Sequence, residues 1–424
     1  MIENIKKIIA KTDRFLFKKF GSEKNIKSLE NLKEAKIIFS HLNEMGSDPK
    51  VRFVGGCVRK AVCGEEIDDI DLATSLEPND VKKKLLKSNI KTFDTGILYG
   101  TITAIVNKKK FEITSLRKDL STDGRHPEVE FTSDWEKDAL RRDLTINAIY
   151  ADIDGNFYDP LNGFSDLKSG KVKFIGSPTE RIQEDYLRIL RYFRFFNQYS
   201  KIDYDDDTIA AIKQNISGIN KISNERIYDE LTKILSLNNL NDLFENKKSK
   251  EVILNIFPQF KYYERLKSFN ILKEDIKNQF SFKLILALLI IDSTDNYEFF
   301  CYKYKTSGSI KDKLKIISQN FENLKIKKFY TEQNLKKLIY LNDKSIVKDI
   351  MLFAQCINNN YKKTNIEDLL DVIDKCVVPK FPISGNDLKR IGYVSGEELG
   401  KRLKSLEKQW LENNFVLNES LKLN

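Results

Sequence analysis

Hydrophobic and polar residues follow two different periods in the two parts of the chain. From Ser28 to Glu44, apolar residues recur every three to four positions, which predicts a helix. Short runs that are apolar or alternating follow, separated by Gly, Asn or Lys breaks that are typical of strand ends. The expected strands are Val51–Val54, Ile70–Ala73, Thr101–Val106, Phe111–Leu116 and Ala148–Ile153. Together these segments predict one mixed sheet flanked by helices.

After Pro160 the strand pattern fades and helical spacing takes over. The segment from Thr179 to Asn197 and the segments that follow it predict successive amphipathic helices. We expect breaks between these helices at Gly218, Pro258 and residues 307–309. The apolar run Leu284–Ile291 is far shorter than the roughly 20 residues that cross a bilayer, so it predicts a buried core helix. The fold class is therefore α+β, a mixed-sheet head followed by a long all-α remainder, with no membrane association.

Composition narrows the chemistry that the chain can carry. Five scattered cysteines and two histidines among 424 residues make a zinc site or a disulfide framework improbable. Carboxylates remain as the candidate metal ligands, and they suit a hard cation such as Mg²⁺. The first residues alternate charge with single apolar positions, unlike a secretory signal, so we expect a cytoplasmic protein.

The charge of the chain fits a polyanionic partner. Its net charge is +10, and within Cys301–Tyr330 eight lysines face two acids. Such a segment can follow a phosphate backbone, or it can form the solvated face of a helix. The aromatic residues interleaved with these lysines are Tyr302, Tyr304, Phe321, Phe329 and Tyr330.

A pair of carboxylates follows a glycine turn in the predicted head. Gly55 and Gly56 come directly after the first strand, where backbone without side chains can approach phosphate. After twelve intervening residues stand Asp69 and Asp71, and the alternation of a strand puts both carboxylates on one face. Alone, this Asp-x-Asp is usually an acidic turn, but its strand context favours a metal site. Glu112, on a neighbouring predicted strand, either completes the ligands or pairs with a lysine.

These residues resemble the signature of the polymerase-β nucleotidyltransferase superfamily. Gly55–Arg59 followed by Asp69–Thr74 carries the likeness, which narrows to class II CCA-adding tRNA nucleotidyltransferases and bacterial poly(A) polymerases. Further matching segments run in order along the chain: Phe111–Arg117, Asp123–Pro127, Arg141–Ala148, Asp159–Pro160 with Gly163, and Glu184–Arg191.

The resemblance implies roles for the matching residues. Asp69 and Asp71 would bind two Mg²⁺ ions, which activate the RNA 3′-hydroxyl and neutralise the triphosphate during in-line displacement of pyrophosphate. The phosphates would be held by Gly55, Gly56 and Arg59, and the sugar and triphosphate by Arg142, Asp143 and Asn147. For the last three residues, a helix start with local ion pairs is the plainer alternative. Lys60 departs from the family, which usually carries an acid there.

A second group of polar residues is suited to choosing the base. Asp185 and Arg188 are three positions apart, so on one helix they project from the same face. An aspartate accepts and an arginine donates hydrogen bonds, which matches the edges of cytosine and adenine and mismatches those of guanine and uracil. The resemblance implies the same pair, with Glu184 orienting the arginine, and Arg191 ends the matching motif. An ordinary helical ion pair is the alternative.

The switch from C to A is assigned by the resemblance to a flexible loop, here residues 121–130. Relatives that add only CC lack a comparable loop, so Asp123, Gly124 and Arg125 indicate that this chain also adds A. A polar connection between strands would have a similar composition.

The expected protein adds CCA to the 3′ end of tRNA from CTP and ATP and releases pyrophosphate. The alternatives are a poly(A) polymerase, an A-adding or CC-adding specialist, and a non-enzymatic RNA-binding module. Its partners are tRNA, CTP and ATP, and the sequence predicts no particular oligomeric state. The expected parts are an N-terminal helix (1–27), a catalytic head (28–153), a nucleotide-selecting neck (154–220), a helical body (221–330) and an RNA-binding tail (331–424).

Overall fold

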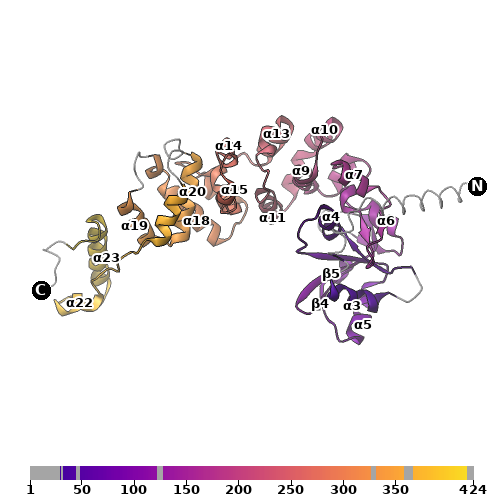
Figure 1. Ribbon diagram of the computed structural model, residues 1–424, viewed down its shortest axis with the longest axis horizontal. Helices are drawn as coiled ribbons and strands as arrows, with labels where there is room; N and C mark the ends of the chain where they lie inside the picture. The colour runs from indigo at the N-terminus through magenta and orange to yellow at the C-terminus, as the bar shows by residue number, and fades with distance from the viewer. Residues whose placement is uncertain are drawn as a thin grey trace, which may run out of the picture. The chain divides into compact units, whose positions relative to one another are not determined.

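The computed structural model describes residues 29, 32–43, 48–121, 128–325, 331–357 and 366–417. The chain divides into two compact units, Met1–Ile256 and Phe257–Asn424 (Figure 1). This division falls inside the segment 221–330 that the sequence predicts as one helical body. The expected N-terminal helix and the loop residues Asp123, Gly124 and Arg125 lie outside the described residues.

All strands among the described residues belong to the first unit. They are β1 (Val51–Val54), β2 (Ile70–Thr74), β3 (Lys91–Gly96), β4 (Thr101–Val106), β5 (Lys109–Ser115), β6 (Arg117–Ser121), β7 (Glu128–Phe131), β8 (Tyr150–Ala151) and β9 (Phe157–Tyr158). In the described part of the chain, seven of them form one sheet in the order β3-β4-β5-β2-β1-β8-β9, and β6 pairs with β7. Because β2 and β5 run parallel while the other neighbours in the sheet are antiparallel, the sheet is mixed, as predicted.

Two predicted strands, Val51–Val54 and Thr101–Val106, have the expected bounds. The strand expected over Ala148–Ile153 is reduced to β8, because Ala148 caps the 3₁₀ turn η2 (Thr145–Asn147) and Asp152 already begins a turn in which its carbonyl accepts the Gly155 N–H. The sequence pattern did not indicate β3. It is an edge strand, and most of its side chains are exposed, so it lacks the apolar alternation of a half-buried strand.

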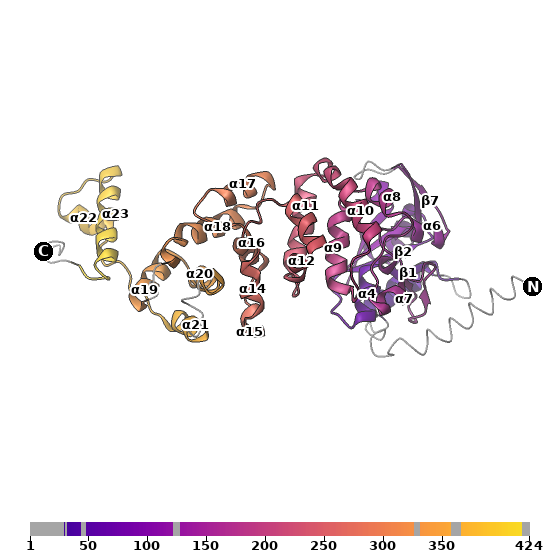
Figure 2. The ribbon, with the colours of Figure 1, turned by 90° about the horizontal axis from the view of Figure 1, so that it is seen from above.

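Helices cover this sheet and continue beyond it within the first unit. They are α3 (Lys33–Leu42), α4 (Gly56–Cys63), α5 (Pro78–Lys87), α6 (Trp135–Leu140), α7 (Gly163–Ser169), α8 (Pro178–Glu184), α9 (Arg188–Tyr199), α10 (Asp206–Asn215), α11 (Asn224–Leu235), α12 (Asp242–Glu245) and α13 (Lys247–Ile256), with the 3₁₀ turns η1 (Ile97–Tyr99) and η3 (Ile216–Lys221). The helix predicted between Ser28 and Glu44 is confirmed by α3, which buries Ile38 and Leu42. Figure 2 shows α8 to α11 gathered together, where α8 packs on α10 and α9 packs on α11.

The second unit is helical throughout its described residues. Its elements are α14 (Arg265–Asn270), α15 (Glu274–Lys277), α16 (Phe282–Ile290), α17 (Asn296–Lys303), α18 (Gly308–Asn320), η4 (Asn323–Lys325), α19 (Glu332–Leu341), α20 (Lys344–Ile357), α21 (Ile366–Lys375), α22 (Gly385–Arg390) and α23 (Glu397–Glu412). The predicted core helix is confirmed by α16, in which every residue from Leu284 to Ile290 is buried. Within the described ranges, no helix is both long and apolar enough to span a bilayer.

The aromatic residues among the lysines of 301–330 do not form one exposed row. Tyr304 and Phe321 are 1% and 7% exposed and pack into the core of the second unit, whereas Tyr302 is 85% exposed. Tyr304 and Phe321 are therefore core residues, and only the exposed lysines of this segment could meet a phosphate backbone. Each ring directly follows a helix, Tyr304 after α17 and Phe321 after α18, and packs against another aromatic ring of the core, that of Phe257 or Phe353.

Candidate active site

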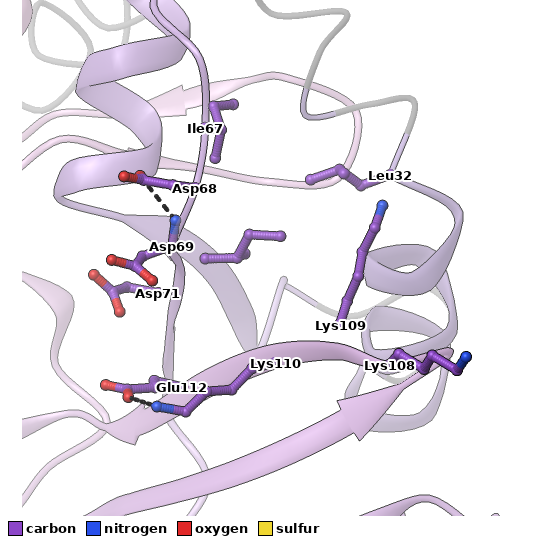
Figure 3. A pocket seen from close by; sticks show the side chains of 10 residues that line it. Leu32, Ile67, Asp68, Asp69, Asp71, Lys108, Lys109, Lys110 and Glu112 are labelled. Carbon is purple, nitrogen blue, oxygen red and sulfur yellow. Dashed lines mark hydrogen bonds and ion pairs between the residues drawn. The ribbon is translucent and has the colours of Figure 1, made fainter. Parts of the chain in front are cut away.

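The predicted carboxylate pair stands at the beginning of β2. Ile70, the first residue of the strand, is 7% exposed, and the carboxylates of Asp69 and Asp71 on either side of it point the same way (Figure 3). Strand β5 runs parallel to β2 and places Glu112 directly beside Asp71. Three acidic side chains, one just before β2, one on β2 and one on β5, therefore gather on one face of the sheet, as the alternation of side chains along a strand requires.

The negative charge of this site is only partly compensated by its neighbours. Burial and the nearby charge of Glu112 raise the pKa of Asp71 to about 6. The Lys110 ammonium lies 2.5 Å from a Glu112 carboxylate oxygen, so the alternative of a lysine partner for Glu112 is seen in the structure. Lys60, the departure from the family pattern, lies 2.5 Å from the Asp68 carboxylate, and an Asp68 oxygen accepts the Asp69 N–H.

The carboxylates of this site can be compared with the ligands that a divalent metal ion requires. In the described stretches, no three carboxylate, imidazole or thiol groups converge closely enough to hold a metal by themselves. Asp69 and Asp71 nevertheless fit a Mg²⁺ site, since this ion is usually bound by one or two carboxylates together with substrate phosphates and water. The raised pKa of Asp71 points the same way, because a bound cation would relieve its repulsion with Glu112.

The glycine turn lies beside the carboxylates. Gly55 has φ +69°, a conformation that a residue with a side chain rarely adopts, and it links β1 to α4. A Cβ atom added to Gly56 would meet no other atom within 4 Å. The first turn of α4 therefore presents its backbone to open space, where N–H groups can meet phosphate.

Four predicted substrate residues form one chain of polar contacts behind the turn. Arg59 donates to the side-chain oxygen of Asn147, whose amide nitrogen donates to Asp143 over 2.9 Å. Asp143 also accepts from the Arg191 Nε at 2.7 Å. Burial alone would raise the pKa of Asp143, but Arg191 and the Asn147 hydrogen bond hold it below its ordinary value. The structure thus brings together residues from α4, η2 and α9 around one ionised carboxylate.

The burial of Arg59 limits what it can touch. Its guanidinium lies over the ring of Phe195, 4.4 Å from the centroid, and only 4% of the residue is exposed. Arg59 is therefore placed to position Asn147, and its direct contact with phosphate stays a prediction.

A second polar cluster holds Arg142 in place. Its guanidinium donates to Asp138 at 2.9 Å and to the Tyr150 hydroxyl at 3.1 Å. Asp138 is 1% exposed and also accepts from Arg141 and Tyr150. Burial opposes its ionisation, yet the two arginines keep its pKa well below the ordinary value. The sequence pattern did not single out Asp138, although its spacing of three and four residues before the two arginines could have indicated a helical ion pair.

Helix α7 packs against η2, the turn that contains Asn147, and this close contact requires a glycine at the start of the helix. A Cβ atom at Gly163 would come within 2.1 Å of the Thr145 carbonyl oxygen. Asp159 accepts the N–H groups of Gly163 and Phe164 at 2.8 Å each, which fixes the start of α7. The matching Asp159 and Gly163 therefore hold α7 directly against η2.

The residues predicted to select the base, Asp185 and Arg188, do not share one helix, so the expectation of a common helical face was wrong. Helix α8 ends at Glu184 and α9 begins at Arg188, while Asp185 has extended backbone between them. Arg188 donates to Glu184 and to the Arg181 carbonyl, so Glu184 does contact the arginine. Asp185 instead accepts from Arg226 of α11 at 2.7 Å. The sequence pattern did not point to Arg226, which lies 41 residues further along the chain.

Comparison with known proteins identifies the family. Residues 51–173 match the model of the poly A polymerase head domain, and residues 203–264 match a probable RNA and SrmB-binding site of polymerase A. The mitochondrial CCA tRNA nucleotidyltransferase 1 of Mus musculus is 35% identical over 421 residues, which cover 96% of this chain and 92% of that protein. This chain belongs to the CCA-adding tRNA nucleotidyltransferase family. The CCA-adding enzyme of Staphylococcus epidermidis is 33% identical, over 76% of this chain and 77% of that protein.

Solved structures of CCA-adding enzymes share the fold. The enzyme of Bacillus stearothermophilus in complex with CTP has a TM-score of 0.68 at 22% identity, covering 90% of this chain and 93% of that chain. The Thermotoga maritima enzyme complexed with tRNA has a TM-score of 0.60 at 19% identity, covering 93% and 96%. The predicted fold class is confirmed. As a CCA-adding family member, the chain is a nucleotidyltransferase, and this enzyme class uses a divalent metal.

Proposed function

We propose that the protein adds C, C and A, one nucleotide at a time, to the 3′ end of tRNA from CTP and ATP. The observation that carries this proposal is the placement of Asp69 and Asp71 beside the Gly55–Gly56 turn, in a chain related over 96% of its length to a CCA tRNA nucleotidyltransferase. The reaction joins the RNA 3′-oxygen to the α-phosphorus of the incoming nucleotide and releases pyrophosphate.

Each group of residues has a part in this reaction. Asp69 and Asp71 would hold Mg²⁺, which supplies Lewis-acid stabilisation of the triphosphate and a more acidic 3′-hydroxyl. The backbone at Gly55 and Gly56 receives the phosphates, and Arg142 is directed by Asp138 toward the sugar and triphosphate. The series of hydrogen bonds from Arg59 through Asn147 and Asp143 to Arg191 keeps this side of the site rigid. Little reorganisation of the protein therefore accompanies the reaction.

Asp185 and Arg188 are proposed to choose the base from the two sides of the helix break. Cytosine and adenine both present an amine beside an unprotonated ring nitrogen, which an acceptor and a donor satisfy together. Uracil and guanine reverse this edge and leave buried polar groups unpaired, at a cost of roughly 1–3 kcal/mol each. The hydrogen bonds from Arg188 to Arg181, Glu184 and Arg141 leave N–H donors of its guanidinium for the base.

The assignments that fall on residues 122–127 also remain proposals. Asp123, Gly124 and Arg125 are proposed to belong to the segment that reshapes the pocket between C and A addition. A cytoplasmic location is proposed as well, while the Mus musculus relative is named as mitochondrial. Fractionation of cells that express the tagged chain would distinguish the two compartments.

The deciding experiment uses purified protein, Mg²⁺, CTP, ATP and a tRNA that lacks its last three nucleotides, with products resolved at single-nucleotide length. Three additions followed by a stop would support CCA synthesis. A stop after two additions would instead identify a CC-adding specialist, and a single A added only to tRNA ending in CC an A-adding one. A long ladder with ATP alone would identify a poly(A) polymerase. Binding of tRNA without pyrophosphate release would identify an RNA-binding module.

A further inference from the structure

Two helices of the first unit begin at the proposed nucleotide site. Figure 1 and Figure 2 both show α9, which begins at Arg188, beside α4, which begins at the glycine turn. Arg188 donates to the Arg141 carbonyl, and the Arg142 guanidinium would lie 3.8 Å from a Cβ atom at Gly55. The starts of the two helices therefore share one wall of the site. A nucleotide bound as proposed would run from the start of α4 to the start of α9.

The far ends of the same two helices are joined through Glu65. Gly64 ends α4 with φ +73°, and the Glu65 N–H donates back to the Lys60 carbonyl at 2.9 Å. This is the Schellman pattern, which fixes the residue just past a helix relative to its last turn. The Glu65 carboxylate accepts from the Tyr199 hydroxyl at 3.0 Å and from the Gln198 side-chain nitrogen at 3.3 Å, both in the last turn of α9.

The hydrogen bond between Tyr199 and Glu65 is sheltered from water. Tyr199 is 8% exposed, and the Arg59 guanidinium lies over its ring, 5.0 Å from the centroid. Burial raises the pKa of Tyr199 to about 12, so its hydroxyl keeps its proton and donates at neutral pH. A hydrogen bond to a charged group is stronger than a neutral one, and stronger still where water is excluded. The contact is therefore suited to holding the end of α9.

The geometry of α9 links this contact to base selection. From Tyr199 back to Arg188 the helix spans about 16 Å, at about 1.5 Å per residue. A small rotation at the Tyr199 end therefore displaces the Arg188 side chain. On the other side of the contact, residues 65–69 form neither helix nor strand and lead directly to Asp69. The Glu65 side chain thus connects the segment with the carboxylates to the helix that carries the base-selecting arginine.

We infer that Glu65 is a positioning residue for base selection, which holds the end of α9 and so sets the distance between the glycine turn and Arg188. The inference rests on the proposed function, in which the triphosphate and the base of one nucleotide occupy these two places. Glu65 contacts no part of the substrate and acts through α9. Without its carboxylate, the backbone that leads to Asp69 stays fixed by α4 and β2, while the base-selecting end of α9 gains freedom.

The test compares Glu65→Ala with Tyr199→Phe, which removes the same hydrogen bond and keeps the ring beneath Arg59. We expect each variant to lower the ratio of kcat/KM for CTP to kcat/KM for UTP about 3- to 10-fold, because a misplaced contact loses transition-state binding of the correct base. The double variant should lose no more than either single one, since all three remove one contact. Glu65→Gln keeps an acceptor oxygen and should recover most of the selectivity.

Glu66→Ala is the matched control. It removes the same charge from the next residue, whose side chain is exposed, and should select as the wild type does. An equal loss in Glu66→Ala would overturn the inference, as would additive losses in the double variant. Variants that melt at a lower temperature but keep the wild-type selectivity would overturn it as well, and would leave Glu65 a purely structural residue.

Direct binding of CTP and UTP in Mg²⁺, without tRNA, gives a second readout that needs no turnover. The ratio of the Kd for UTP to the Kd for CTP should fall by a similar factor in Glu65→Ala and Tyr199→Phe. The Mg²⁺ concentration that half-saturates CTP binding should stay unchanged, because Asp69 and Asp71 keep their places. If the wild type prefers CTP in binding but adds nothing to tRNA, the proposed function fails, while the Kd ratios still decide the role of Glu65.

Discussion

Asp71 is a half-buried carboxylate beside a second one, Glu112, and its pKa is raised to about 6. In an unfolded chain the value is about 3.9, so folding disfavours the ionised form. The penalty is absent below pH 4, grows as the pH rises toward 6, and is fully present above that. The metal-free site is therefore a place where stability is given up for function.

We predict that Asp71→Asn abolishes nucleotide addition and yet stabilises the metal-free protein at pH 7.5 by about 1–3 kcal/mol. Urea unfolding in EDTA measures the difference, which should vanish near pH 4. Asp68→Asn is the matched control, since Asp68 is exposed and the hydrogen bond from Lys60 lowers its pKa. If Asp71→Asn were instead less stable than the wild type at pH 7.5, the ionised Asp71 would not be a source of instability.

Magnesium should compete with the proton at the same residue. Because the ligand must be ionised, the apparent Mg²⁺ affinity should fall about tenfold for each pH unit below about 6 and change little above it. Thermal shifts in Mg²⁺ and CTP titrations between pH 5 and 7.5 measure this dependence. In Asp71→Asn the shift should be small at every pH. A flat wild-type profile would mean that Asp71 is not a metal ligand.

At the scale of elements, the break between α8 and α9 separates the two residues that we propose to read the base. Asp185 leaves the helix at this break and accepts from Arg226 of α11, while Arg188 starts the next helix. The acceptor and the donor thus belong to separate elements, and α11 helps to fix their spacing.

We predict that Arg226→Ala reduces discrimination of CTP and ATP against UTP and GTP by about tenfold, because Asp185 loses a charge-assisted hydrogen bond of about 1.5–3 kcal/mol. Single-turnover addition with each of the four nucleotides measures it. The Mg²⁺ dependence should stay unchanged, which separates lost orientation of Asp185 from general damage. Lys233→Ala, on the exposed side of the same helix, is the control and should select normally. Unaltered selectivity in Arg226→Ala would show that Arg226 only stabilises the fold.

The same break shows where sequence patterns stop being informative. The strand bounds of β1 and β4 and the clustering of Asp69 with Asp71 follow from local alternation, so they were predictable. Nothing local ends α8, since residues 185–187 include neither proline nor glycine. A Cβ atom at Gly218 would come within 2.0 Å of the Tyr186 ring, so the break depends on a distant glycine that accommodates this ring.

Predictability differs among the site residues for the same reason. Motif spacing indicated Arg142, Asp143 and Asn147, but the partners that hold or extend them come from tertiary structure. Asp138 lies close in sequence and was open to inference from helical spacing, whereas Arg226 reaches Asp185 only through the packing of α11. Patterns in a single sequence reveal the residues proposed to act on the substrate. They reveal less readily the residues, such as Asp138 and Arg226, that hold those residues in position.

In the whole molecule, every described residue assigned to the chemistry belongs to the first unit, and the second unit is helical. The net charge of +10 supports binding of tRNA, with the helical remainder expected to make phosphate contacts. Binding of nucleotide should therefore stabilise the first unit alone, whereas binding of tRNA should stabilise both units.

We predict that Mg²⁺ with a non-reactive CTP analogue slows amide hydrogen exchange within residues 51–256 and leaves residues 257–417 unchanged. The physical reason is linkage, since a ligand at 100 times its Kd stabilises the structure it binds by about 2.7 kcal/mol. Addition of tRNA should extend the protection into the second unit. Asp69→Ala provides the control, because without its metal ligand the protection by the nucleotide should largely disappear, while that by tRNA should remain. Protection of residues 257–417 by the nucleotide alone would instead show that the two units respond to the active site as one.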